Sequence, residues 1–234
     1  AHMRSPVNIS TLPTELFVRR VTTGSPIYRK TELDRCIDED LLLLTEEDPD
    51  VVVGDMRLTL AVTCAMLKIP YIALAGAQWS PYSAAPIPFP EHPSTRLAGM
   101  TMARQVFHML RPLIFRRFLK PFNALCRDYG VDEFESLFDL YTRADMTLYA
   151  DVPGLFPLND LPRTHRFIGP LFHRDNSGLP AWHREVTAQP QERPVVYVSA
   201  GTSGSPEATR LAVEALIETG ARVLFSTPDP GKGL

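Results

Sequence analysis

The sequence has few cysteines and no apolar run of the roughly 20 residues that a membrane-spanning helix needs. Its three cysteines, Cys36, Cys64 and Cys126, lie far apart, so neither a disulfide framework nor the paired spacing of a zinc site is present. Cys64 and Cys126 fall in apolar helical patterns, where a thiol packs as a small hydrophobic group. This cysteine usage favours a reducing cytoplasm, and we expect no integral membrane association.

An excess of positive charge is also missing. Lys and Arg number 24 against 27 Asp and Glu, for a net charge of -3, so binding of nucleic acid by bulk electrostatics is not expected. The histidines outside the first residues show neither i,i+4 pairing nor a metalloprotease-type context; they are His92, His108, His165, His173 and His183. We therefore expect no metal ion, and each of these side chains is more typical of packing or of the surface.

The sequence does show the alternation of helices and strands that is typical of an α/β fold. A helix is predicted over residues 31–44, with Thr31 as its N-cap. A β-branched strand at 51–53, ending in Gly54-Asp55, then a helix at 58–68 and a strand at 71–74 follow it. Short strands that are apolar throughout are typical of a parallel sheet covered on both faces. The fold class predicted is a Rossmann-like, doubly wound parallel sheet.

The rest of the chain predicts two domains. Residues 4–30 show no strong period, and a long proline-rich loop runs from Ala75 to Pro93. One or two helices are predicted over 95–127, strands over 146–150, 166–171, 195–199 and 222–225, and a helix over 206–218. Because residues 172–194 are polar and rich in turn formers, we predict a first domain over 4–173, a linker over 174–194 and a second domain over 195–234.

The predicted helix at 95–127 places Arg and Lys among apolar residues. A basic amphipathic helix can bind a membrane surface. The alternative is a helix whose charged side chains face solvent. We favour this alternative, because the net charge of the chain is negative and the helix has no long aromatic face.

A loop of small residues, Gly201-Thr202-Ser203-Gly204, separates the predicted strand 195–199 from the helix that follows. Backbone N–H groups and the helix N-terminus at such a place suit a phosphate, and the hydroxyls add donors. The ordinary alternative is a turn that uses glycine for its backbone freedom. The loop matches neither the dinucleotide fingerprint, nor the Walker loop, nor the hydrolase nucleophile elbow.

Asp55 ends a predicted buried strand, where a parallel sheet presents its ligands. A carboxylate there can orient a histidine base. The alternative interpretation is that Asp55 caps the helix that begins near Arg57. These two interpretations remain open on the residues alone.

The proline-rich loop carries Trp79, Tyr82 and Phe89, flat apolar side chains of the kind that bind sugars or planar molecules. The alternative is that they anchor the loop on the core, and both roles are compatible. His92 lies in the same loop and is a candidate base.

Four segments occur in an order that resembles bacterial nucleotide-sugar glycosyltransferases of family one, the macrolide- and flavonoid-type enzymes with the GT-B fold. They are PDVVVGDMRLTLAVTCAMLKIPYIALAGAQWSPYS, TLYADVPGLFP, FIGPLF and PVVYVSAGTSG. The resemblance covers nearly all of residues 10–230. It implies two Rossmann-like domains, of which the first binds the acceptor and the second the nucleotide sugar.

The resemblance also implies roles for particular residues. Asp55 matches the aspartate that orients a histidine base, and Gly201, Thr202, Ser203 and Gly204 match the loop near the donor diphosphate. Trp79, Tyr82, Phe89 and His92 fall in the segment that lines the acceptor. The implied reaction transfers sugar from a nucleotide-diphosphate sugar to a hydroxyl of a small natural product, with inversion and with neither metal nor cofactor.

The chain departs from the family pattern at both ends. The family's first βα unit, with its catalytic histidine, and its later donor-sugar signature are not in this sequence, so we expect little or no transfer by this chain alone. The sheet would then expose an interior edge, which a second copy or a partner chain would cover. The second hypothesis is a non-catalytic auxiliary subunit of a complete glycosyltransferase. The missing nucleophile elbow disfavours an unrelated α/β hydrolase.

Overall fold

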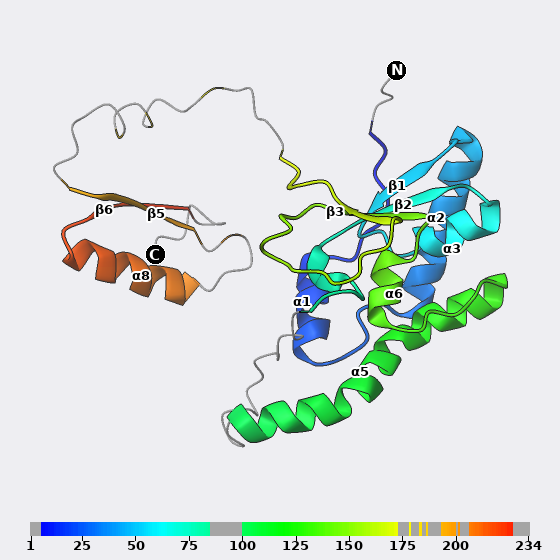
Figure 1. Cartoon of the computed structure of the whole chain (residues 1–234), viewed down its shortest axis with the longest axis horizontal. Helices are drawn as coiled ribbons and strands as arrows, with labels where there is room; N and C mark the ends of the chain where they lie inside the picture. Colours follow the sequence, from blue (N-terminus) through cyan, green and yellow to red (C-terminus); the bar gives the residue numbers. More distant parts are fainter. Residues whose placement is uncertain are drawn as a thin grey trace. The chain divides into compact units, whose positions relative to one another are not determined.

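The computed structural model describes residues 6–84, 100–172, 193–199 and 206–226, together with the single positions 178, 183, 186 and 201. The chain divides into two units, Ala1–Phe172 and His173–Leu234. The described part of the first unit is built on a four-stranded sheet and that of the second on a two-stranded sheet (Figure 1).

The strands of the first unit form one parallel sheet in the order β1-β2-β3-β4. They are β1 (Val52–Asp55), β2 (Tyr71–Ala75), β3 (Met146–Tyr149) and β4 (His165–Phe167). In this register Asp55 lies beside Leu74, and Ala75 lies beside Tyr149. The carboxyl ends of the strands therefore meet at one edge, and the predicted α/β class with a parallel sheet is confirmed.

The helices of this unit precede or connect these strands, with the first two before β1. They are α1 (Thr14–Thr22), α2 (Lys30–Glu47), α3 (Leu60–Leu67), the 3-10 turn η1 (Ala77–Trp79), α5 (Met100–Tyr129) and α6 (Leu137–Thr142). The helix predicted over 95–127 is a single element, although Pro112 and Pro121 lie inside it. The strand predicted over 166–171 is shorter, because Gly169 has a positive φ of 79° and Pro170 follows it.

The start of α2 differs from the prediction. The N-cap is Arg29 and not Thr31, because the Glu32 carboxylate accepts the backbone N–H of Arg29 at 2.8 Å. The same carboxylate binds the guanidinium of Arg20 at 2.6 and 2.7 Å. Arg20 lies on α1, a helix that the sequence did not predict, and only 7% of it is exposed. A buried arginine on the inner face of α1 interrupts the apolar period by which a helix is recognised.

One face of the sheet packs against α2 and α3. Val52, Tyr71 and Ala73 contact Leu44, Leu60 and Cys64 in one apolar cluster. Gly54 lies under Leu60, where a Cβ atom would come within 2.5 Å of Leu60 Cδ1, so this strand position admits only glycine without rearrangement. A second cluster joins α2, α3 and the later turns of α5 through Leu33, Ile37, Val62, Leu119, Phe122, Leu125 and Cys126. Burial of Cys64 and Cys126 confirms the interpretation of both thiols as core residues, and all three cysteines are free.

The strand β1 lies at an edge of the sheet. Within the described residues it pairs only with β2. Val53 is 55% exposed and Val51 46% exposed, which is unusual for the apolar residues of a parallel strand. An exposed edge was expected from the sequence, and what covers it stays a prediction.

The second unit has the predicted strand, helix and strand. They are β5 (Val195–Ser199), α8 (Pro206–Glu218) and β6 (Arg222–Ser226), and the two strands are parallel with Val196 beside Val223. Val213 of α8 is buried, whereas Tyr197 is 65% exposed. Most of the linker predicted over 174–194 lies outside the described residues.

A buried ion pair fixes the segment that follows β1. The Asp40 carboxylate, only 3% exposed, accepts hydrogen bonds from Nε of Arg57 at 3.0 Å and from the Thr59 hydroxyl at 2.5 Å, and Nη2 of Arg57 lies 2.9 Å from it as an ion pair. Arg57 also donates to the carbonyls of Ser10 and Cys36. Burial disfavours its charge, but the hydrogen bond and charge of Asp40 outweigh burial and raise the pKa of Arg57. The pair ties α2, the N-terminal segment and the turn after β1 together.

Removal of Arg57 tests this tie. We expect Arg57→Met to lower the free energy of unfolding by about 3–5 kcal/mol, because Asp40 is left buried without its partner. Arg127→Met is the matched control, since its ion pair with Glu133 is half exposed and such pairs contribute about 0–1 kcal/mol. Urea unfolding followed by circular dichroism measures both, and equal losses for the two variants would contradict the assignment.

Candidate functional site

The candidate site begins at Asp55, the last residue of β1. Its side chain is exposed and forms no hydrogen bond or ion pair with the described residues of the chain. Asp55 does not cap α3, because the cap position is Thr59 and the first helical N–H, that of Leu60, binds the Arg57 carbonyl. The helix-cap interpretation of Asp55 is therefore wrong. The carboxylate keeps its capacity to accept hydrogen bonds at the edge where parallel strands present ligands.

The residue after Asp55 holds an uncommon backbone conformation. Met56 has a φ of 54°, in the left-handed region that a long side chain rarely adopts. The neighbouring Arg57, fixed by Asp40, holds the turn in place. The turn borders a cavity of about 150 Å³ whose wall includes Ile9, Tyr28 and Asp55. No sequence pattern predicts a methionine in this conformation, and such strain clusters at functional sites.

The loop after β2 is anchored next to this edge. The Asp151 carboxylate accepts the backbone N–H of Ala77 at 2.6 Å, and an isolated bridge joins Ser83 to Leu158. The buried Tyr149 hydroxyl donates to Oγ of Ser80 at 2.8 Å. These contacts come from Tyr149 at the end of β3 and from Asp151 and Leu158 between β3 and β4, so the neighbouring part of the sheet holds the loop after β2.

The aromatic residues of this loop contact the protein. Trp79 stacks on Tyr141 of α6, with ring centroids 4.3 Å apart and an interplanar angle of 26°. Tyr82 meets His165 edge to face at 5.2 Å. The anchoring role considered for these rings is thus present, and both side chains remain partly exposed. Their acceptor role stays a prediction, and the candidates Phe89 and His92 lie outside the described residues.

His165, at the start of β4, belongs to the same network. Its Nδ1 lies 2.7 Å from the Tyr149 hydroxyl. Since that hydroxyl gives its hydrogen to Ser80, the tautomer with hydrogen on Nδ1 completes the chain of bonds. Burial lowers the pKa of His165 from 6.5, which favours the neutral ring. Sequence reasoning had placed this histidine among ordinary packing or surface residues, because its partners come from distant segments.

The donor-side candidates are described only in part. Gly201 follows β5 and has a φ of 63°, a conformation that favours glycine. Thr202, Ser203 and Gly204 lie outside the described residues, and α8 begins at Pro206.

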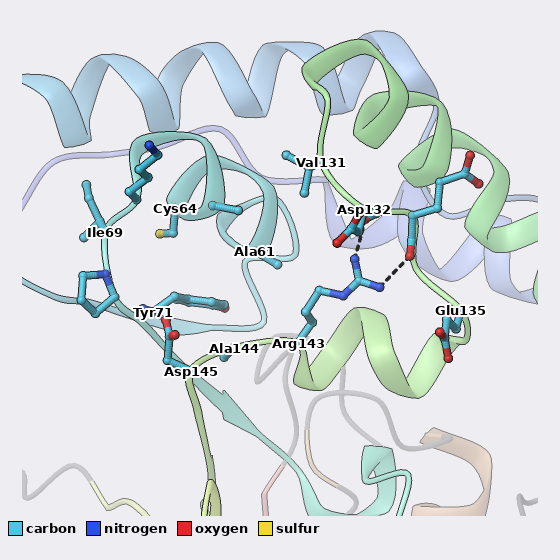
Figure 2. A pocket seen from close by; sticks show the side chains of 14 residues that line it. Ala61, Cys64, Ile69, Tyr71, Val131, Asp132, Glu135, Arg143, Ala144 and Asp145 are labelled. Atoms are coloured by element: carbon cyan, nitrogen blue, oxygen red, sulfur yellow. Dashed lines mark hydrogen bonds between the residues drawn. The ribbon is translucent and has the colours of Figure 1, made fainter.

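A larger cavity, of about 850 Å³, lies at the opposite, amino-terminal edge of β2 and β3 (Figure 2). Tyr71 and Asp145 border it at the strand starts, and Arg143 projects from its wall. The Arg143 guanidinium donates to the carbonyls of Asp132 at 2.5 Å and Glu133 at 2.7 Å, as Figure 2 shows. Asp145 accepts the backbone N–H of Tyr71 at 2.8 Å. These charged groups serve the fold, and the cavity is remote from the carboxyl edge.

Two further observations concern the kinds of site present. Among the described residues, no three His, Cys, Asp or Glu side chains are grouped so that they would hold a metal ion. In the same part of the chain, no helix has both the length and the apolar character to cross a membrane.

Solved structures that resemble this chain include glycosyltransferases of the GT-B class. One, from Streptomyces sp. SF2575 and complexed with thymidine diphosphate, has a TM-score of 0.50 at 17% identity and covers 95% of this chain. The spinosyn rhamnosyltransferase has a TM-score of 0.52 at 18% identity and covers 92%. The chain spans 49% and 50% of those proteins, respectively. At sequence identities this low, the structural similarity shows a shared fold and nothing about the activity of this chain.

Sequence relatives identify the chain as a relative of bacterial glycosyltransferases, as its motifs indicate. It is 37% identical over 220 residues to a PGL/p-HBAD biosynthesis rhamnosyltransferase of Mycobacterium bovis and 36% identical to a PGL/p-HBAD biosynthesis glycosyltransferase of Mycobacterium tuberculosis. Both alignments include 94% of this chain. The chain spans about half the length of these relatives, 48% and 51%. A Mycobacterium bovis relative named as inactive is 37% identical over 209 residues. No protein-family model matches the chain.

The buried network predicts a pH dependence. Because the pKa of His165 is lower in the folded protein than the ordinary 6.5, the unfolded chain binds more protons as the pH falls below that value. The contribution of neutral His165 to the free energy of unfolding should therefore be fully present above pH 6.5. It should be lost as the pH falls from 6.5 through the pKa that His165 has in the folded protein. Thermal unfolding at a series of pH values measures the decline, and His165→Asn should flatten it. An unchanged pH profile in that variant would assign the decline to other groups.

Proposed function

We propose that the chain is part of a glycosyltransferase that transfers sugar from a nucleotide-diphosphate sugar to a hydroxyl group of a small-molecule acceptor. The transfer inverts the anomeric centre and needs neither a metal nor a cofactor. The relationship to glycosyltransferases over 94% of the chain supports the reaction class. The chain supplies most of the acceptor half and the first strand–helix–strand unit of the donor half, and it works in a reducing compartment.

The observation that carries the proposal is the exposed carboxylate of Asp55, which binds no other residue in the described part of the chain. It lies at the carboxyl edge of the sheet, on a turn that the Asp40–Arg57 pair holds in place. A carboxylate in this position can accept a hydrogen bond from an imidazole and so orient it as a base toward the acceptor hydroxyl. Trp79 and Tyr82, on the neighbouring loop, offer partly exposed rings to the acceptor.

On the donor side, Gly201 is proposed to let the loop before α8 approach a diphosphate. The backbone N–H groups and the positive end of a helix favour negative charge at such a place. A solved neighbour was obtained with thymidine diphosphate, so a nucleoside diphosphate is the ligand class to test. Thr202, Ser203 and Gly204 are proposed to contact the same group.

Nucleotide binding tests the donor assignment. Gly201→Val should weaken binding of thymidine or uridine diphosphate about tenfold or more, because a side chain at positive φ costs about 1–2 kcal/mol and the loop must shift to relieve it. Gly220→Val is the matched control, since Gly220 has a φ of 80° and, like Gly201, has nothing within 4 Å of an added Cβ. Titration calorimetry measures both affinities. Equal weakening in the two variants would show only general strain.

Asp55 gives a separate test on the acceptor side. Asp55→Asn should keep the free energy of unfolding within about 0.5 kcal/mol, as for a surface substitution. It should lower sugar transfer about 10²-fold or more wherever transfer by the unmodified protein is measurable, because base catalysis is lost. Release of nucleoside diphosphate from a donor sugar, with a panel of hydroxylated acceptors, is the measurement. Full transfer by Asp55→Asn would remove Asp55 from the mechanism.

A second candidate function is a non-catalytic subunit that completes or activates another glycosyltransferase. A relative that is 37% identical to this chain is named as inactive, which supports a non-catalytic function as the second candidate. Nucleotide binding without transfer to any acceptor, together with a transferase that co-purifies from the source cell, would support it over the catalytic function. Homo-oligomerisation through the β1 edge is the corresponding alternative if no other protein co-purifies.

A further inference from the structure

The first half of α5 exposes a row of large apolar side chains. Met102 is 60% exposed, Val106 42%, Met109 74% and Leu113 68%. Their spacing of i, i+4, i+7 and i+11 places all four on one face of the helix. We call these four residues the apolar stripe of α5. In Figure 1 this half of α5 extends away from the helices that cover the sheet.

Basic residues follow the apolar stripe on the same face of α5. Arg116, Arg117 and Lys120 follow Leu113 at three, four and seven positions, so they lie in line with the stripe. All three are exposed and form no ion pair with the described residues. From Met100 to Arg127 the sequence contains six Lys and Arg residues and no Asp or Glu. The local charge is therefore strongly positive although the whole chain is slightly negative.

A basic cavity adjoins the end of the stripe. It has a volume of about 730 Å³ and lies between α1 and α5. Its wall includes Arg19, Arg20, Arg29, Lys30, Arg117 and Lys120, and none of the described residues in the wall is acidic. Glu32 pairs with Arg20, and Asp34 and Asp128 pair with Lys30. Arg117 and Lys120 form no ion pair with a described acidic residue, although Glu133 and Glu135 line a neighbouring cavity with them.

We propose that the apolar stripe and the adjoining basic residues form a docking surface for an anionic phospholipid membrane. Apolar side chains that extend from a helix insert at the boundary of headgroups and acyl chains, while Arg and Lys beside them contact lipid phosphates. Charge complementarity favours this partner, since every charged Lys, Arg, Asp or Glu side chain from Met100 to Arg127 is a cation. A second copy that docked through the same helix would place cations against cations, because α5 has no acidic residue before Asp128. Neither the stripe nor Arg117 and Lys120 line the small cavity at Asp55, although Tyr28 lies in the walls of both cavities.

Co-sedimentation of the whole chain with lipid vesicles tests the proposal. The protein should bind vesicles of equal parts phosphatidylcholine and phosphatidylglycerol, and bind phosphatidylcholine vesicles at least tenfold more weakly. Arg117→Gln with Lys120→Gln should lower affinity for the anionic vesicles about 25-fold, because each cation near such a surface contributes about a fivefold factor. The binding should also weaken as salt is raised.

The apolar stripe has its own variant. Met109→Glu with Leu113→Glu should abolish vesicle binding and leave the far-ultraviolet circular dichroism unchanged, because both side chains are exposed. The matched control is Leu42→Glu with Leu211→Glu, which adds the same charge at side chains that are 62% and 54% exposed on α2 and α8. That control should bind as the unmodified protein does.

Three outcomes would overturn the proposal. The first is no binding of the unmodified protein to anionic vesicles. The second is equal vesicle binding by the stripe variant and by its control. The third is an effect of the stripe variant on self-association alone, seen by analytical ultracentrifugation without vesicles, which would make the surface a contact between protein chains. If the stripe variant fails to fold, the Arg117 and Lys120 substitutions decide between these outcomes and the proposal.

Discussion

The buried pair of Asp40 and Arg57 is the interaction on which the candidate site depends. It joins α2 to the turn after β1, and through the carbonyls of Ser10 and Cys36 it holds the N-terminal segment as well. A buried charge pair gives little net stability, but it tolerates few other arrangements, because either charge alone is costly inside a protein. The arrangement that it enforces leaves Met56 in a left-handed conformation and Asp55 exposed at the end of the strand.

The parallel register then places the other parts beside Asp55. Leu74 lies next to Asp55, so the loop that begins after Ala75 starts within one strand spacing of the carboxylate. Tyr149, at the end of β3, and Asp151, two residues later, hold this loop by hydrogen bonds to Ser80 and Ala77. Trp79 and Tyr82, the acceptor-side candidates among the described residues, thus lie on a loop that neighbouring strands hold, as a binding loop on a rigid scaffold requires.

Much of this arrangement could be predicted from the sequence, and the failures have physical reasons. The strands were found because their β-branched residues are consecutive and bounded by turns, and the position of Asp55 followed from the rule for parallel sheets. Helix α1 was missed because Arg20 occupies an inner position. Arg29 was missed as an N-cap because arginine lacks the short side-chain acceptor by which an N-cap is recognised. Neither the conformation of Met56 nor the bonds between His165, Tyr149 and Ser80 has a local signal, since each depends on contacts between distant segments.

The three cysteines described in the core have a practical consequence. Cys36, Cys64 and Cys126 lie on α2, α3 and α5, and all are buried and free. Burial raises the pKa of each thiol, that of Cys64 to about 12, and only the thiolate reacts readily. A thiol reagent can modify such a residue only when its helix opens. The chain therefore carries three internal reporters, and the rate at which each cysteine is labelled measures how often that helix leaves the core.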